Sequence, residues 1–166
     1  MFDNVKLRYT AQDKNHGTFV IEPLPQGYGM TIGNGLRRVL LSSLPGAAIT
    51  SVKIHGATHE FSSLKGVKED MVQFLLNLKR VRVKMDSKDK VVLKLSATGP
   101  GPVRAKDIET PAGVKISNGD EHLATLADKK TKLEVEQTVE AGPGYMPVEV
   151  RKASGIGVIQ LDGVFS

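Results

Sequence analysis

The sequence predicts an α+β fold with many short strands and two helices. Glycine and proline divide the 166 residues into mostly short intervals rich in Val, Ile and Thr, which is typical of strands joined by turns. Two intervals instead repeat apolar residues with a period of 3.6, which indicates amphipathic helices. With 40% hydrophobic and 25% charged residues, the composition is that of a globular chain with a core.

The first helix is predicted to follow a strand at Phe19–Leu24. It should begin at Thr31, a residue suited to the N-cap, and end before Pro45–Gly46. The apolar residues that recur on one of its faces are Ile32, Leu36, Val39, Leu40 and Leu44. This stripe is the face that we expect to be covered.

The opposite face of this helix carries a leucine among polar residues. Placing successive residues 100° apart brings together Asn34, Arg37, Arg38 and Leu41. A leucine beside two arginines has the composition of a protein interface, because it combines an apolar anchor with guanidinium groups that can make bidentate contacts. A single exposed leucine is also common on monomers, so both interpretations stay open.

The second helix is predicted to run from Gly66 to about Arg80. Its apolar face repeats at Val67, Met71, Phe74, Leu75 and Leu78. Glu69 and Asp70 are expected in its first turn and Lys79 in its last, where the helix dipole favours these charges.

The other intervals predict strands. They are Ala48–Ile54, Arg80–Met85, Lys90–Ser96, Leu133–Val139 and Gly157–Leu161. Arg80–Met85 and Lys90–Ser96 flank the polar turn Asp86–Asp89 and are predicted to pair as a hairpin. Within the first of them, Val81, Val83 and Met85 should point inward, with Arg82 and Lys84 outward.

The basic charge is concentrated in this predicted hairpin. The net charge is +5, from 23 Lys and Arg against 18 Asp and Glu, and the window 79–94 holds seven of the bases and two of the acids. The remaining sixteen bases and sixteen acids balance, so this window carries the whole surplus. One interpretation of this surplus is a basic nucleic-acid-binding module acting through residues 79–94. The other is the solvent-exposed face of a half-buried strand.

Other chemistry finds little support in the sequence. Without cysteine there are no disulfides and no cysteine-ligated metals. The glycines of Gly27–Gly33 lack the Lys-Ser/Thr of a phosphate-binding loop. A metal-dependent hydrolase using His55, His59 and Glu60 would need this segment to be helical. The strand-forming residues directly before it, Ile49–Ile54, favour a strand and a turn instead. We expect no catalytic residue, metal or cofactor in this chain.

The N-terminal residues lack the apolar run of a secretory signal. The longest apolar stretches, Val39–Leu41 and Phe74–Leu76, are far too short to span a bilayer. The sequence therefore predicts a cytoplasmic chain without membrane contact.

One long stretch, Glu22–Gly46, reads EPLPQGYGMTIGNGLRRVLLSSLPG. It closely resembles the first characteristic segment of the bacterial RNA polymerase α-subunit family. Further blocks resemble the same family in the same order along nearly the whole chain: His59–Ser62, Gly66–Asp70, Leu75–Lys79, Gly99–Val103, Ala105–Ile108, Gly144–Pro147 and Ile156–Asp162. Eight ordered blocks make coincidence negligible.

The resemblance implies a discontinuous α/β dimerisation domain with a β-rich domain inserted in it. Residues 1–46 and 152–166 would belong to the first, and 47–151 to the insert. Family members usually continue past this point through a further strand, a second dimerisation helix, a linker and a C-terminal DNA-binding domain. We therefore expect the dimerisation domain to be incomplete in these 166 residues, and no specific nucleic-acid contact without the C-terminal domain.

The resemblance further implies a non-catalytic scaffold subunit of DNA-directed RNA polymerase, a nucleotidyltransferase complex, that recruits the β and β′ subunits. Arg38 and Leu41 match family contacts to β, Lys79 and Leu161 match positions linked to β′ assembly, and Ser166 matches another functional position. The family dimerises chiefly through the first helix, which assigns its stripe to the dimer interface: Ile32, Leu36, Val39 and Leu40. Homodimerisation is a family property that the sequence leaves open for this chain.

Overall fold

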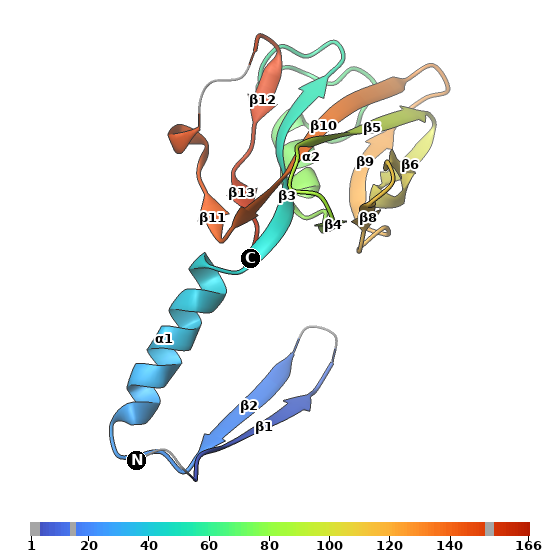
Figure 1. The fold of residues 1–166 in the computed structure, drawn as a ribbon. Coiled ribbons are helices and arrows are strands. Elements are labelled where there is room, and N and C mark those ends of the chain that lie inside the picture. The colour runs from blue at the N-terminus through green and yellow to red at the C-terminus, as the bar shows by residue number, and fades with distance from the viewer. Residues whose placement is uncertain (1–3, 14–15, 152–154) are drawn as a thin grey trace. The chain divides into compact units, whose positions relative to one another are not determined.

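The computed structural model describes residues 4–13, 16–151 and 155–166, and its fold is α+β, as predicted (Figure 1). The chain forms two compact units, Met1–Val39 and Leu40–Ser166. The predicted domain boundaries at residues 46 and 152 stay a prediction.

The first unit contains an antiparallel hairpin and most of a helix. Strands β1 (Lys6–Ala11) and β2 (Gly17–Glu22) pair along their whole length. Helix α1 (Tyr28–Ser42) begins three residues before the predicted start, so Thr31 lies inside the helix and is not its N-cap. Gly27 adopts a φ of +88°, and the Tyr28 amide donates to the Pro25 carbonyl, so a tight turn starts the helix earlier.

The second unit is built on a sheet that has seven strands among the described residues. Six of them follow the order β7-β5-β10-β3-β4-β8, and β12 also pairs with β3. The strands of this sheet are β3 (Pro45–Ile54), β4 (Val83–Met85), β5 (Val91–Thr98), β7 (Ile108–Glu109), β8 (Val114–Ile116), β10 (Lys132–Pro143) and β12 (Val158–Gln160). All six predicted strands are thus confirmed, with shifted ends, as β2 in the first unit and as β3, β4, β5, β10 and β12 in this sheet.

Two short ribbons and two 3-10 turns complete the unit. The strand pairs are β6 (Gly101–Arg104) with β9 (His122–Leu126), and β11 (Tyr145–Met146) with β13 (Gly163–Val164). The 3-10 turns are η1 (Ala105–Asp107) and η2 (Val148–Val150).

The predicted hairpin between the basic strands is wrong. Strand β4 pairs with β3 and β8, whereas β5 pairs with β10 and β7, so two strands separate β4 from β5. The Asp86 amide donates to the Gly113 carbonyl, which extends the pairing of β4 toward β8. The local turn therefore does not decide the pairing. The inward and outward pattern does hold, because Val81 and Val83 are buried while Arg82 and Lys84 are exposed.

Helix α2 (Met71–Lys79) covers the core and packs against β9 and β3. Its inward residues, Met71, Phe74, Leu75 and Leu78, are buried as predicted. The helix starts later than expected, because Asp70 is its N-cap and accepts a hydrogen bond from the Gln73 amide at 2.7 Å. The residues before it pair with β9 instead, with the Lys68 amide donating to the Thr125 carbonyl.

Glu69 therefore lies outside the helix, and its side chain connects the segment before α2 to β9 through hydrogen bonds. One carboxylate oxygen accepts from the Thr125 amide at 2.6 Å, and the other contacts His122 Nε2 at 2.8 Å and the Thr125 hydroxyl at 2.9 Å. Burial alone would raise the pKa of Glu69, but the hydrogen bonds from His122 and Thr125 outweigh it and hold the pKa below the ordinary 4.5.

This shift predicts an acid-sensitive contribution to stability. A carboxyl whose pKa is lowered by folding stabilises the protein above its unfolded pKa, and that contribution is lost as the pH falls below about 4.5. Glu69→Gln should lower the free energy of unfolding by about 1–2 kcal/mol at pH 7 and much less at pH 3. Urea unfolding at both pH values measures this difference. Glu136→Gln, at an exposed site, is the control, and an equal loss at both pH values would contradict the assignment.

Candidate functional site

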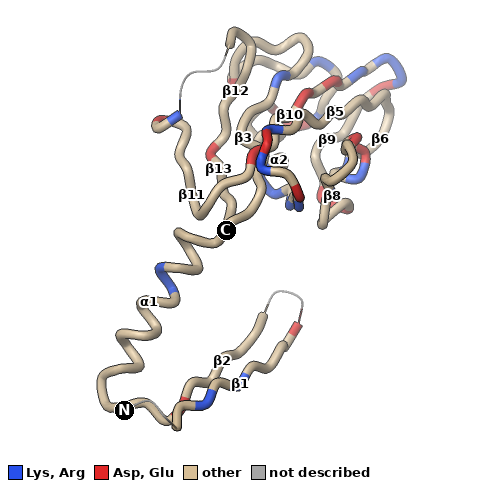
Figure 2. The backbone as a smooth tube through the Cα atoms, viewed as in Figure 1, with Lys and Arg blue, Asp and Glu red and all other residues tan. Residues whose placement is uncertain are grey.

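Helix α1 exposes the residues that sequence analysis assigned to partner binding. No described residue of α1 is buried, and Leu41 is 62% exposed. Arg37 and Arg38 are the only charged residues of the helix and form its single basic turn (Figure 2). The apolar stripe is accessible too, with Leu36, Val39 and Leu40 about half exposed.

The C-terminal end of α1 is anchored to the ribbon formed by β11 and β13. The Gly144 amide donates to the Leu44 carbonyl at 3.1 Å, and the Ser166 hydroxyl donates to the Leu41 carbonyl at 3.2 Å. The Phe165 amide in turn donates to the Gly144 carbonyl at 2.7 Å. The structure thus brings together Leu41 and Ser166, two positions that are 125 residues apart in the sequence.

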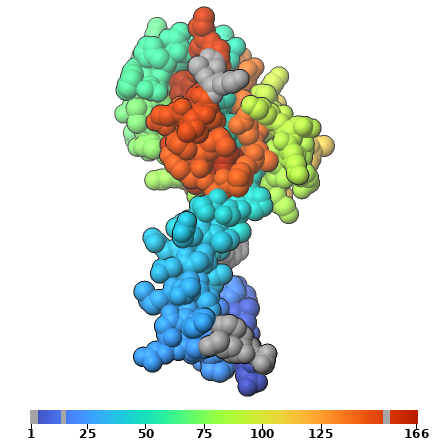
Figure 3. Space-filling view, turned by 60° about the vertical axis from the view of Figure 1, so that its left-hand side comes forward, coloured from blue at the N-terminus to red at the C-terminus, as the bar shows by residue number. Residues whose placement is uncertain are grey.

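In the space-filling view, the orange atoms of the β11 and η2 region lie beside the cyan atoms where α1 ends and β3 begins (Figure 3). Within the second unit, the residues that follow α1 and the ribbon thus lie side by side.

Lys79, the last residue of α2, is tied to the same ribbon through Asp162. Lys79 Nζ donates to Asp162 Oδ2 at 3.0 Å, and the Val148 amide donates to Asp162 Oδ1 at 3.1 Å. Tyr145 is close enough for the Asp162 charge to act on its hydroxyl. The Lys79 hydrogen bond is the main cause that holds the pKa of Asp162 below its ordinary value, while desolvation and the Asp162 charge raise the pKa of Tyr145.

Leu161 is a core residue rather than an exposed contact. Only 6% of it is exposed, and its amide donates to the Thr50 carbonyl at 2.8 Å. Its carbonyl accepts from the guanidinium of Arg151, the residue that follows η2. A partner cannot reach this side chain directly, so any effect of Leu161 on assembly passes through the packing around it.

Two residues that hold this arrangement together were not singled out from the sequence: Gly144 and Asp162. They lie inside blocks that carried the family resemblance, but nothing in their spacing showed that they meet. Lys79 and Asp162 are 83 residues apart, and Asp162 and Val148 are 14 apart. The role of the Asp162 carboxylate can be recognised only once the strands that bring these segments together are known.

The basic window does not form one cationic surface. Lys79 is paired with Asp162, Lys90 contacts Glu140 at 2.5 Å, and Arg80 lies 3.8 Å from Glu121. Because β4 and β5 are not neighbours, the remaining bases are divided between separate parts of the sheet. The hairpin on which the nucleic-acid hypothesis depended is therefore not formed.

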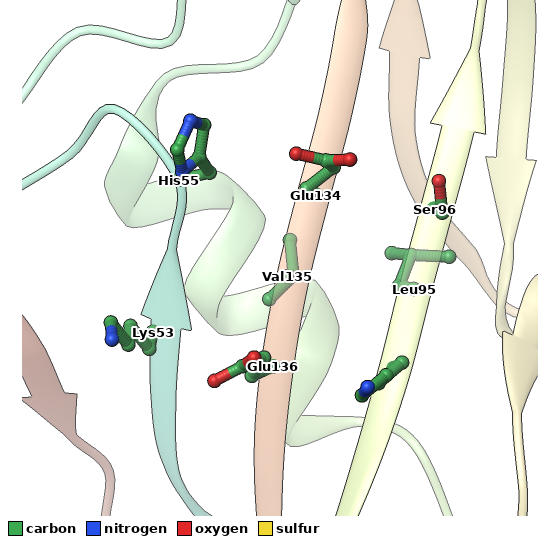
Figure 4. A pocket seen from close by; sticks show the side chains of 8 residues that line it. Lys53, His55, Leu95, Ser96, Glu134, Val135 and Glu136 are labelled. Carbon is green, nitrogen blue, oxygen red and sulfur yellow. The ribbon is translucent and has the colours of Figure 1, made fainter.

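The open face of the sheet carries polar side chains around a hollow of about 340 Å³ (Figure 4). Lys53 of β3 and Glu136 of β10 are cross-strand neighbours, and Lys94 of β5 lies opposite Glu136 on the other side. This charge alternation is typical of the solvent face of an antiparallel sheet.

The metal hypothesis gains no support from the geometry. His55 lies in a turn at the end of β3, and the ring of His59 accepts a hydrogen bond from the Phe61 amide at 3.2 Å. In the part of the chain that the structure describes, no three or more His, Asp or Glu side chains are grouped as metal ligands. Within the same residues, neither helix has the length and apolar character needed to cross a membrane.

Comparisons with known proteins agree on one family. Residues 52–166 match the model of the RNA polymerase Rpb3/RpoA insert domain. DNA-directed RNA polymerase subunit alpha of Symbiobacterium thermophilum is 54% identical over 158 residues, which are 94% of this chain and 50% of that protein. The same subunit of Herpetosiphon aurantiacus is 49% identical over 161 residues, 97% of this chain and 49% of the relative. The same subunit of Corynebacterium glutamicum is 51% identical over 155 residues, which are 93% of this chain and 46% of that protein. The chain thus spans about half the length of the curated relatives it matches.

Proposed function

Because the chain belongs to the bacterial RNA polymerase α-subunit family, we propose that it is a non-catalytic assembly subunit that recruits the β and β′ subunits of DNA-directed RNA polymerase. In this proposal the chain contributes binding surfaces to a nucleotidyltransferase complex in the cytoplasm, while its partners supply the catalytic residues and cofactors.

The observation that carries the proposal is the exposed surface of α1 next to its anchored end. Leu41 and Arg38 are one helical turn apart and both are exposed. Hydrogen bonds from Gly144 and Ser166 hold the carbonyls of Leu44 and Leu41 in place. These hydrogen bonds fix the end of the helix before a partner binds. An apolar anchor and a guanidinium on such a helix end therefore lose little conformational entropy on binding. We assign β docking to this pair.

The other surfaces complete the proposal. The stripe of Ile32, Leu36, Val39 and Leu40 is assigned to a dimer interface, since three of these apolar side chains, Leu36, Val39 and Leu40, are exposed and a partner would cover them. Lys79 and Leu161 are assigned to β′ assembly. Residues 1–46 and 152–166 are proposed as parts of the dimerisation domain, and 47–151 as the insert.

Truncating the docking leucine tests the proposal. Leu41→Ala should weaken β binding by at least about tenfold, because the loss of a buried interface anchor costs about 2 kcal/mol. The urea midpoint should stay unchanged, because the side chain is already exposed. Arg38→Ala should act in the same direction. Affinity for purified β subunit is the measurement.

Leu76→Ala is the matched control, because it removes the same atoms from a half-exposed leucine of α2 that has no assigned binding role, and it should spare β. If Leu41→Ala and Leu76→Ala weakened β binding equally, or if both lowered stability in step with binding, the assignment of the docking face would be wrong.

A further inference from the structure

Asp162 is an acceptor to which both α2 and η2 are tied. Lys79 is the last residue of α2 and Val148 is the first of η2, and each donates a hydrogen bond to this carboxylate. Both carboxylate oxygens are therefore used in joining segments that are remote in sequence. Hydrogen bonds to a charged acceptor are stronger than those between neutral groups, so this residue fixes the segments firmly.

We infer that Asp162 is a positioning residue for partner binding and that Lys79 acts through it, not by touching a partner. This inference rests on the proposed function, because it concerns how the β′ surface is built. The Lys79 side chain is only 29% exposed and its ammonium group already has a partner. Leu161 is buried directly before Asp162 in the chain. A change at either residue disturbs the same carboxylate.

The segment that Asp162 holds presents the contact surface. Tyr145 is 57% exposed and Val150 is 69% exposed. Val164 lies directly opposite Tyr145 in the β11–β13 pair and is also exposed. An exposed aromatic ring opposite an exposed valine is suited to an apolar surface on the partner. The carboxylate orients this group because it holds the Val148 amide, three residues after Tyr145, and directly precedes β13, the strand that pairs with Tyr145.

A double-mutant cycle on β′ capture tests the inference. This chain is bound to purified β, and its affinity for β′ is measured for Lys79→Met, Asp162→Asn and the double variant. Each single change should weaken β′ capture by about tenfold, the value of one charged hydrogen bond. The double variant should be no more than about threefold weaker than the weaker single variant, because both changes break one interaction. Lys79→Arg, which keeps the donor, should retain most of the affinity.

Effects that multiply to about 100-fold in the double variant would overturn the inference, because Lys79 would then have its own contact with β′. Failure of the native chain to capture either subunit would instead reject the proposed function, and the inference with it.

Hydrogen exchange gives a readout on the isolated chain. In Asp162→Ala, which removes both acceptor oxygens, the Val148 amide should exchange at least about tenfold faster, while amides in β10 keep their native rates. Unchanged protection at Val148 would contradict the positioning role, whatever happens to the partners.

Discussion

Leu161→Ala is expected to lower the free energy of unfolding by about 3 kcal/mol, because truncating a buried leucine removes apolar contacts and leaves a cavity. The side chain belongs to the core cluster that also contains Val52 and Ile159. Partner binding by this variant should fall in step with its folded fraction. Urea unfolding, followed by circular dichroism, measures the change.

Leu76→Ala is the matched control, because Leu76 is half exposed on the outer side of α2. The same atoms are removed, but the stability should change by less than about 1 kcal/mol. A Leu161→Ala variant that keeps native stability yet loses β′ would show that Leu161 is a direct contact, contrary to its position in the core.

Gly144→Ala is expected to destabilise the second unit by about 3 kcal/mol for two separate reasons. Gly144 has a φ of +59°, which an alanine adopts only at a cost, and its added Cβ would overlap the carbonyl oxygen of Ser42 at the end of α1. The hydrogen bond from the Gly144 amide to the Leu44 carbonyl should be lost as the segments separate. Thermal unfolding and β affinity should both fall.

Gly113→Ala separates the two reasons. Gly113 also has a positive φ, of +81°, but a Cβ there would meet no atom within 4 Å. Its substitution should cost only about 1 kcal/mol. Equal losses in the two variants would mean that the close approach to Ser42 contributes nothing.

The helices and long strands could be predicted from the sequence because their signals are local. The buried face of α2 follows from the spacing of Met71, Phe74, Leu75 and Leu78, and β10 alternates buried and exposed side chains along most of its length. Helix starts were less accurate. Asp70 caps α2, whereas Glu69 bonds to Thr125 on a distant strand, and only the tertiary structure separates their roles.

Strand pairing and the site geometry could not be predicted in this way. The turn between β4 and β5 looks like a hairpin turn, yet burial of both strands against remote partners determines the sheet order. The exposed Arg38 and Leu41 were visible in the helical pattern. The connections of Leu41 to Ser166 and of Lys79 to Asp162 depend on segments more than 80 residues apart.

The proposed role as an assembly subunit can be tested by purifying this chain together with cognate β and β′ and determining the mass of the complex by native mass spectrometry. We predict a complex in which the chain is bound to β and β′, and in which Leu41→Ala removes it from β. A native chain that is folded by circular dichroism but remains separate from both subunits would contradict this role.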